Sequence, residues 1–428
     1  MRRLLFLVTL GAALWLAPGA LAAGWCGSGE TAADRPDIVT GAQVHAIVAT
    51  PADGPDAFVD DANRLSDDVA SMSAWWTGQD PTRVPRYDLA VFPGGTCLDI
   101  SYVRLAETAS ELQASATRSY NIVRSELGTA DFVHPYKDYV VYYDGPAEQD
   151  ICGTGNGFFD QGGGFAIVWL NGCPGVPTDG VEAHELLHAL GALPVGAPNA
   201  CTPATDPSGD FDAGHPCDSQ SDILFPQTDG RPLQQMVLDF NHDDYYAHSG
   251  TWNDMQDTIF LRHLNAPQVE LDVQVSGTGS VASDMPGVVC AKACGTQWDE
   301  GTTVTLFPTP GDGSRFVRWS GSCTGTRADC VLSLTQTESA TAVFGPAFVA
   351  FHSSVTGRGK VACSPACGRK IPAGDPFTLR AVAAKGWRFA RWSGGCKGTR
   401  LTCRPKTTQA LSVRATFTKL KARPKKNH

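Results

Sequence analysis

The sequence His184-Glu185-Leu186-Leu187-His188-Ala189-Leu190-Gly191 decides how the first half of this chain is expected to fold and act. Two histidines four positions apart lie on one face of a helix, so both imidazoles can reach a single ion. Glu185 then lies beside that ion, where its carboxylate can take a proton from a metal-bound water. The pattern predicts a Zn²⁺ site in which His184 and His188 are ligands and Glu185 is the general base.

The residues around this motif predict an alternation of strands and helices. Residues 178–180 have the chemistry of a helix N-terminus, and Gly191 with Pro194 would end the helix. The 428 residues allow more than one domain, and we place the boundaries of the first at residues 24–266. Within it, hydrophobic spacing and β-branched or aromatic content predict strands at 44–49, 98–105, 137–143 and 164–170 and helices at 58–76 and 107–127.

The motif, followed by Ser221-Asp222-Ile223-Leu224-Phe225-Pro226, resembles the metzincin type of zinc endopeptidase. The resemblance covers about 80 residues around the motif. It implies an α/β (α+β) peptidase domain that hydrolyses a protein or peptide substrate with a zinc-activated water. In this family the turn carries a Met where this chain has Leu224, and Leu224 is expected to supply the same apolar floor by packing. The resemblance also suggests that Tyr245 or Tyr246 stabilises the oxyanion, and that a substrate strand pairs with a sheet edge at 165–170.

The third zinc ligand departs from the family pattern. A catalytic zinc normally has three protein ligands and a water, but the family's third position is Pro194 here, and no Glu lies between Glu185 and Glu270. We choose His215, because a Cys201–Cys217 disulfide would hold its loop rigidly beneath the helix. The alternatives that stay open are His242, His248 and the aspartates between 206 and 222, such as Asp206 and Asp212. Loss of the third ligand would instead leave a catalytically inactive surface-binding protein on a former peptidase scaffold.

The N-terminus and the cysteines indicate the compartment. Residues 1–23 combine Arg2 and Arg3, an apolar run and Ala20-Leu21-Ala22, which predicts a secretory signal peptide. The apolar run is too short to predict a transmembrane segment. Fourteen cysteines in an exported chain predict disulfides, and the mature protein is expected to be secreted, extracellular or associated with the cell surface. In the first domain, proximity along the chain favours the pairs Cys26–Cys97, Cys152–Cys173 and Cys201–Cys217, but six cysteines allow fifteen connectivities and the sequence does not choose among them. In the C-terminal part we expect the pairs Cys290–Cys294, Cys323–Cys330, Cys363–Cys367 and Cys396–Cys403.

An internal repeat fills the C-terminal part of the chain. Four cysteines and Trp319 recur at a constant offset of 73 residues, so that Trp392 is the equivalent of Trp319. We predict two β modules at 268–346 and 347–419, each closed by local disulfides because each is too small for a large core. They resemble internalin-type B-repeats. The two Trp residues are expected in the core, although a carbohydrate platform is the alternative.

Charge is divided unevenly along the chain. From Ala347 to the end there are 18 Lys or Arg and one acid, Asp375, in a chain whose net charge is −10. This excess predicts an anionic partner such as a cell-wall polymer, an acidic glycan or lipid headgroups. No nucleic-acid recognition motif accompanies it. A solvated basic tail at 420–428 with no specific ligand is the other interpretation, and the sequence does not choose between the two.

Overall fold

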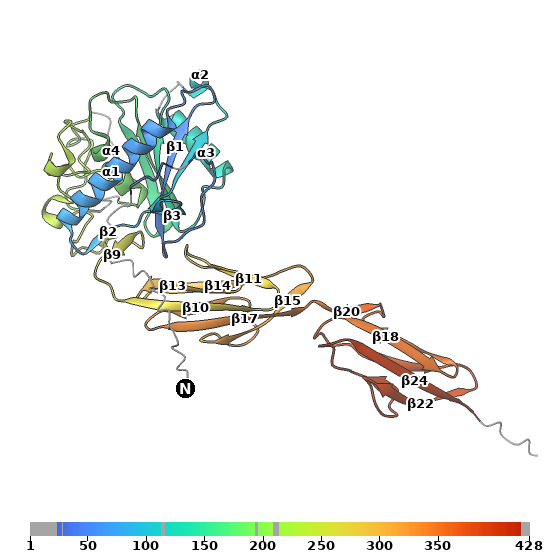
Figure 1. Cartoon of the computed structure of the whole chain (residues 1–428). Coiled ribbons are helices and arrows are strands. Elements are labelled where there is room, and N and C mark those ends of the chain that lie inside the picture. Colours follow the sequence, from blue (N-terminus) through green and yellow to red (C-terminus); the bar gives the residue numbers. More distant parts are fainter. Residues whose placement is uncertain (1–23, 28, 113–115, 193–195, 209–213, 421–428) are drawn as a thin grey trace, which may run out of the picture.

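The computed structural model describes residues 24–27, 29–112, 116–192, 196–208 and 214–420. The predicted signal peptide, Pro194, Asp212 and the tail beyond residue 420 lie outside these ranges. An N-terminal body that contains both helices and a sheet is followed by two β modules arranged one after the other (Figure 1). None of the helices in the described ranges has both the length and the apolar character needed to cross a membrane.

The body is built on a five-stranded sheet in the order β5-β1-β6-β8-β7. Its strands are β1 (Gln43–Thr50), β5 (Ile100–Arg104), β6 (Lys137–Tyr143), β7 (Gly153–Phe158) and β8 (Gln161–Trp169). The first four strands of that order are parallel, whereas β7 runs antiparallel to β8 and forms one edge. β6 is buried along its whole length, and this explains its continuous run of apolar and aromatic residues, since strands of parallel sheets are covered on both faces.

Helices cover both faces of this sheet. On one face α1 (Phe58–Gln79) and α4 (Thr178–Ala189) pack into one core through residues such as Leu65, Val69 and Leu186. On the other face α3 (Ala116–Thr129) contributes Val123 and Leu127 to a separate core. The short helix α2 (Ala109–Leu112) precedes α3. The helix predicted at 58–76 is confirmed, because its apolar spacing of three to four residues places one stripe on the sheet.

Two local expectations were wrong. The strand predicted at 98–105 is two strands, since β4 (Gly95–Leu98) pairs with β3 (Leu89–Phe92) before β5 begins. The break falls at Asp99, whose buried carboxylate accepts a hydrogen bond from the Arg35 backbone at 2.9 Å. The helix predicted at 107–127 is found as α2 and α3, and residues 113–115 between them lie outside the described ranges. The sheet edge predicted at 165–170 is an inner strand, because β7 pairs along its outer side.

Each C-terminal module consists of two β-sheets packed on a core. The first has sheets β13-β10-β17-β15 and β12-β11-β14-β16, and the second has β20-β18-β24-β22 and β19-β21-β23. Their bounds are β10 (Gln268–Ser276), β11 (Gly279–Ser283), β12 (Val289–Cys290), β13 (Ala293–Asp299), β14 (Thr303–Pro310), β15 (Ser314–Gly321), β16 (Cys330–Ser333), β17 (Glu338–Pro346), β18 (Phe348–Thr356), β19 (Gly359–Ser364), β20 (Lys370–Pro372), β21 (Thr378–Ala383), β22 (Trp387–Gly394), β23 (Thr402–Cys403) and β24 (Leu411–Lys419). The remaining elements are β2 (Arg83–Pro85), β9 (Leu261–His263) and the 3-10 turns Leu233–Gln235, Phe240–His242 and Met255–Asp257.

The disulfides and the repeated Trp residues match the expectations from the sequence. All seven predicted pairs are present. Trp319 and Trp392 are 2% and 3% exposed, and each indole N–H donates to a carbonyl within its own module. The core interpretation of these residues is therefore confirmed, and the tryptophans do not form an exposed platform.

The first module is docked on the body. The Arg86 guanidinium lies 2.6 Å from a carboxylate oxygen of Asp299, and the two side chains are only 11% and 18% exposed. The Thr40 hydroxyl donates to the Gln297 carbonyl at 2.6 Å, and Tyr136 packs against the cores of both parts. Polar and apolar contacts therefore fix the module to the body beyond the connecting chain.

Removing the ionic part of this contact should destabilise the protein. In an Asp299→Ala variant Arg86 keeps its buried position without its anion, so we expect a loss of about 2 kcal/mol in unfolding free energy, less than for a fully buried pair. Denaturant melts measure this loss. Asp329→Ala is the matched control, because Asp329 pairs with Arg327 on the exposed surface of the same module. Equal stability of the two variants would show that the Arg86 pair does not help to hold the module.

Candidate metal centre

The helix α4 presents His184 and His188 one turn apart on the same face. It ends as the sequence predicts. Gly191 adopts a φ of +89°, and a Cβ atom there would lie 2.3 Å from the Phe159 backbone nitrogen. Both the left-handed conformation and the close approach require glycine. The end of the helix is therefore packed directly against the turn that joins β7 to β8.

Three imidazole nitrogens converge at this helix. The Nε2 atoms of His184, His188 and His215 lie 3.2 Å from one another in all three pairs. Two nitrogens bound to one zinc at 2.0–2.1 Å with a tetrahedral angle are about 3.3 Å apart. The spacing therefore fits three ligands of one zinc ion, and a fourth position would be left for water.

The hydrogen bond made by the Nδ1 atom of His184 shows that its Nε2 atom is the one that can bind a metal. Its Nδ1 atom lies 2.6 Å from the Ile223 carbonyl oxygen. A carbonyl only accepts, so Nδ1 carries the proton and Nε2 presents a lone pair to the other two rings. Burial, and then the neighbouring His215, lower the pKa of His184 to about 3. Burial also lowers the pKa of His188 well below its usual value. Both rings are neutral at pH 7, and this is the form that binds a metal.

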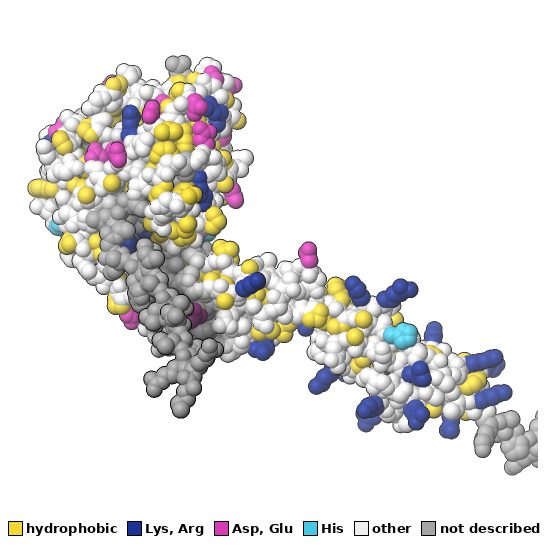
Figure 2. All heavy atoms as spheres, viewed as in Figure 1, with side chains coloured by type: hydrophobic (Ala, Val, Ile, Leu, Met, Phe, Trp, Pro, Cys, Tyr) yellow, Lys and Arg dark blue, Asp and Glu magenta, His cyan; other side chains and the backbone are white. Residues whose placement is uncertain are grey.

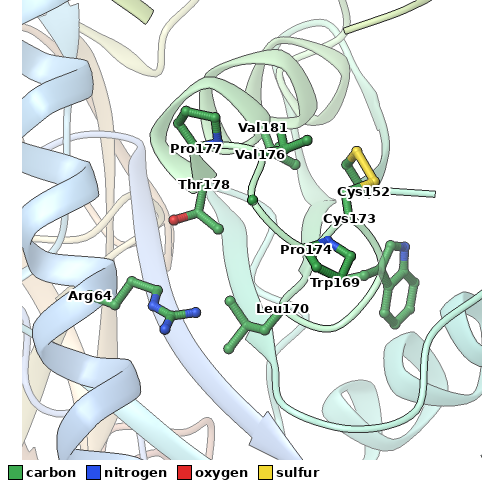
Figure 3. A pocket seen from close by; sticks show the side chains of 11 residues that line it. Arg64, Cys152, Trp169, Leu170, Cys173, Pro174, Val176, Pro177, Thr178 and Val181 are labelled. Atoms are coloured by element: carbon green, nitrogen blue, oxygen red, sulfur yellow. A yellow bond between two sulfur atoms is a disulfide. The ribbon is translucent and has the colours of Figure 1, made fainter. Parts of the chain in front are cut away.

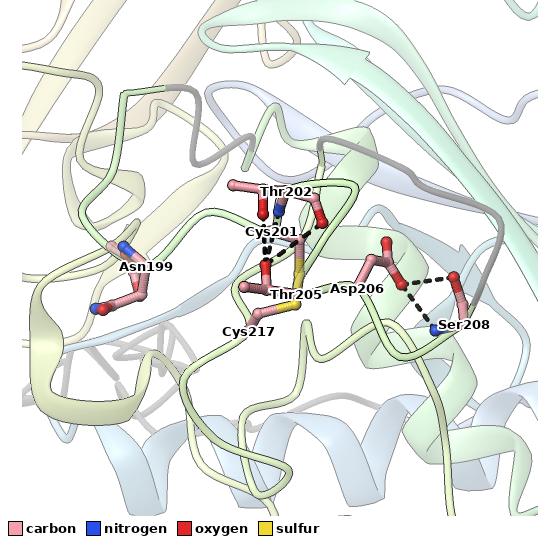
Figure 4. Close-up of a disulfide and its surroundings, with 8 residues drawn as sticks. Asn199, Cys201, Thr202, Thr205, Asp206, Ser208 and Cys217 are labelled. Carbon is pink, nitrogen blue, oxygen red and sulfur yellow. Dashed lines mark hydrogen bonds between the residues drawn. A yellow bond between two sulfur atoms is a disulfide. The ribbon is translucent and has the colours of Figure 1, made fainter.

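The loop that carries His215 is closed by the Cys201–Cys217 disulfide (Figure 4). The Cys201 backbone N–H donates to the His215 carbonyl at 2.8 Å, and the Cys217 N–H donates to the Asn199 carbonyl at 2.8 Å. His215 is thus held through its main chain beside a covalent link. The sequence reasoning chose this residue for the same reason.

Among the described residues, the alternative third ligands do not join this group. Within the described ranges, the metal-capable group that contains His184 consists of His188 and His215. The His248 ring stacks on Trp252 with centroids 4.7 Å apart, and His242 is exposed. Asp206 accepts hydrogen bonds from Ser208, as Figure 4 shows, and Asp212 lies outside the described ranges.

A buried carboxylate organises the turn beneath the histidines. Asp222 accepts hydrogen bonds from the backbone N–H groups of Leu224 and Phe240 at 2.8 and 2.7 Å and from the Tyr245 hydroxyl at 2.8 Å. Burial raises the pKa of Asp222 to about 7. The turn places the Ile223 carbonyl against His184, and Leu224 is fully buried in the adjoining core. Leu224 therefore occupies an apolar position here through packing, as expected.

The two tyrosines expected at an oxyanion are structural. Tyr245 and Tyr246 are each 1% exposed. Their hydroxyls donate to Asp222 and Asp80 at 2.8 Å. Because both groups are used inside the core, the expectation that one of them faces a substrate was wrong.

The strand β7 supplies a feature that the sequence reasoning missed. A Cβ atom at Gly153 would lie 2.4 Å from Glu185 Cγ, and one at Gly155 would lie 2.4 Å from the Glu185 carbonyl oxygen. At Gly157 it would lie 1.6 Å from the Ala189 carbonyl oxygen. Glycines at alternate positions face one side of a strand, so this face accommodates the helix at close approach. Their two-residue spacing was the available signal.

A pocket of about 290 Å³ lies at the other end of α4 (Figure 3). Its wall includes Val181, one turn before Glu185, and Cys152, the residue before Gly153. Trp169 lies on the same side as the Cys152–Cys173 disulfide, and Arg64 reaches the pocket from α1. The pocket is thus adjacent to the start of β7, but it does not include the three histidines.

Two other acidic groups lie in the body. Asp34, His45, Asp88 and Asp99 come together at the start of β1. Lys137 already supplies a cation there, with Nζ 2.7 Å from both Asp34 and Asp88, so no metal is required for charge balance. The second group consists of Asp218, Asp243 and Asp244.

Asp138 is a buried acid near the end of α4. It is fully buried on β6, one oxygen accepts from the Gly164 N–H at 2.8 Å, and the other has no hydrogen-bond partner among the described residues. Burial raises its pKa well above the usual value. A raised folded-state pKa contributes stability that is present below the unfolded pKa and is lost as pH rises through the folded value.

The Asp138→Asn variant should therefore show a different pH dependence from the wild type. Asn resembles the neutral acid, so the stability of the variant relative to wild type should rise as the pH increases from 4 toward the raised pKa of Asp138. Urea melts between pH 4 and pH 9 test the prediction. The control is Asp67→Asn, because Asp67 is exposed. A constant difference between Asp138→Asn and wild type would contradict a neutral Asp138.

Comparison with known proteins supports the repeats. Residues 277–347 and 352–422 each match the model of the divergent InlB B-repeat domain. These matches and the paired cysteines fit a secreted or surface protein. No curated protein matches the sequence.

Some solved structures align with parts of the chain, but at low similarity. The minor pilin GBS52 of Streptococcus agalactiae has 3% identity, 37% coverage of this chain, 100% coverage of its own and a TM-score of 0.17. The major pilin of Streptococcus pyogenes has 6% identity, coverages of 37% and 99% and a TM-score of 0.17. OgpA from Akkermansia muciniphila has 11% identity, coverages of 89% and 98% and a TM-score of 0.25. TM-scores this low do not establish a shared fold.

Proposed function

We propose that this protein is a secreted zinc endopeptidase of the metzincin type. The observation that carries the proposal is the set of three Nε2 atoms at mutual distances of 3.2 Å, contributed by His184, His188 and His215. Glu185 lies on the same helix between two of them. Zinc peptidases activate water with this arrangement, in which two metal ligands and a carboxylate lie on one helix.

The roles of the residues follow from this geometry. His184, His188 and His215 would hold zinc, which supplies Lewis acidity and lowers the pKa of a bound water toward neutrality. Glu185 takes the proton from the attacking water and passes it to the leaving amine. Its side chain is only 7% exposed and lies against the glycine face of β7. This enclosure limits competing water and fixes the direction of the carboxylate.

The substrate is expected to bind along β7. This strand pairs with β8 on one side, and no strand pairs with its other side within the described ranges. An extended peptide can add to such an edge through main-chain hydrogen bonds. The pocket beside Val181 and Cys152 would then accept a substrate side chain at one end of the bound peptide.

The two C-terminal modules are assigned to attachment. The match to B-repeat domains suggests surface-associated interactions, and the basic charge of the second module favours an anionic cell-wall polymer or glycan. The body would therefore act at a surface to which the second module binds.

Metal removal provides the direct test of the proposed activity. We expect purified mature protein to contain about one zinc per chain, to lose hydrolysis of casein after dialysis against a chelator, and to regain it with added Zn²⁺. Metal analysis and a fluorescent casein assay measure both quantities on the same samples. Addition of Mg²⁺ in place of Zn²⁺ is the control. It should not restore hydrolysis, because Mg²⁺ prefers oxygen ligands. Hydrolysis that persists after the zinc has been removed would contradict the proposal.

A further inference from the structure

The two modules share a fold but differ in charge. Residues 268–346 contain eight acids and four Lys or Arg, whereas residues 347–419 contain one acid and 14 Lys or Arg. In the space-filling view, blue side chains are spread over the whole visible side of the second module but are sparse on the first (Figure 2). Both modules have the same disulfide spacing and the same sheet orders, except that the first module has one additional strand, β12, so the fold itself does not account for the difference.

Equivalent positions show this directly. At the 73-residue offset, Arg380 replaces Phe307, Arg404 replaces Val331 and Arg414 replaces Thr341. The first module folds with uncharged residues at these positions, and the three arginines are exposed in the second. Surface charge that the scaffold does not require is the electrostatic mark of a binding function.

The cations occupy both outer faces of the sandwich. We call the outer side of β20-β18-β24-β22 face A and the outer side of β19-β21-β23 face B. Inward positions of β24 such as Val413 and Ala415 are buried, so Arg414 between them points outward on face A. Leu379 and Ala381 place Arg380 outward on face B in the same way. Register and alternation add Lys370, Arg388 and Arg391 to face A and Lys360 and Arg404 to face B.

The charges on both faces lack neutralising partners. Among the described residues of the second module, no Lys or Arg side chain forms an ion pair; the last pair along the chain is Arg327–Asp329 in the first module. Arg414 Nε donates instead to the Ser354 hydroxyl at 3.2 Å, and Arg388 Nε donates to the Thr418 hydroxyl at 3.3 Å. Both guanidinium groups therefore remain available to an external anion.

We propose that the second module binds a linear acidic polysaccharide that contacts both faces at once. A flat anionic surface would neutralise one face and leave the other unpaired, whereas a flexible chain, or several chains of a network, can reach both. Guanidinium groups match the geometry of carboxylates. The proposal deepens the attachment proposed above and is independent of the peptidase activity.

The experiment compares two triple variants of the mature chain. The face A variant carries Lys370→Gln, Arg391→Gln and Arg414→Thr, and the face B variant carries Lys360→Ser, Arg380→Thr and Arg404→Thr. Two of the new residues, Gln at 370 and Thr at 414, occur at the equivalent positions of the first module, which folds with them. Binding to polygalacturonate at 50 mM salt should fall about tenfold in each variant and about a hundredfold in the combination, with a shallower salt dependence.

Charge-retaining variants and two other probes complete the test. Arg391→Lys with Arg414→Lys should keep wild-type affinity, and unchanged melting temperatures show that the module is folded. Phosphatidylserine vesicles and duplex DNA are compared at the same salt. The proposal is overturned if wild-type protein does not bind polygalacturonate, if only one face variant loses affinity, or if vesicles or DNA bind more tightly. Binding is measured without proteolysis, so an inactive peptidase would not affect the outcome.

Discussion

Replacement of Glu185 by Gln is expected to reduce hydrolysis by about 10²-fold or more while zinc remains bound. Gln has the shape of Glu, and this matters because Glu185 is 7% exposed with its Cγ against Gly153. The variant therefore keeps the packing and loses the proton acceptor. The three histidines that would hold the metal are untouched. Turnover of fluorescent casein and the zinc content of the same preparation measure the two effects.

Glu182→Gln is the matched control for this experiment. Glu182 is a fully buried acid on the same helix, and its oxygens accept hydrogen bonds from Tyr87 and Tyr142 at 2.7 and 2.8 Å. Burial raises its pKa to about 8, so Gln resembles its neutral form at pH 7. We expect this variant to retain most of its activity. Near-wild-type turnover by Glu185→Gln would refute the proposed mechanism, and equal losses in both variants would indicate helix distortion.

His215→Ala should lower zinc affinity by at least about tenfold, and by more than either His248→Ala or His242→Ala. The physical reason is that the Nε2 atom of His215 completes the group with His184 and His188, and a structural or catalytic zinc needs at least three protein ligands. His248 stacks on Trp252 and His242 is exposed. These two variants control for the general loss of an imidazole.

Metal analysis after equal dialysis against a weak chelator distinguishes the three variants. Full zinc occupancy in His215→Ala would assign the third ligand to another group, with Asp212 the first to test. Tight zinc binding without hydrolysis in the wild type would support the inactive surface-binding protein instead. These two outcomes can be distinguished, because zinc occupancy and casein turnover are measured in independent assays.

The sequence predicted those parts of the fold that depend on local patterns. The apolar spacing of α1 and the β-branched content of β6 each indicate burial from the sequence of a single element. Disulfides between cysteines 4, 7, 16 and 21 residues apart were predictable because short loops keep their ends close. His215 could be chosen because it lies two residues from one of these cysteines.

The parts that were missed depend on tertiary contacts. Glycine has a weak preference for strands. Gly153 and Gly155 nevertheless lie in β7, where any larger residue would collide with Glu185. Tyr245 has the chemistry of an oxyanion donor, but its hydroxyl is directed at Asp222, 23 positions earlier. The division of the strand at Asp99 likewise depends on the distant Arg35. None of these partners is visible in a local window of sequence.

The docking of the first module would set a minimum distance between the proposed peptidase site and the proposed attachment module. The Arg86–Asp299 contact fixes this module to the body, and a single residue, Ala347, separates it from the second module. β10 of the first module has nine residues and spans about 30 Å, so the module adds about this length between the body and the second module. The first module lies between the body and the second module (Figure 1), so a protein bound through its last module would carry the proposed site at least the length of one module away from the bound polymer.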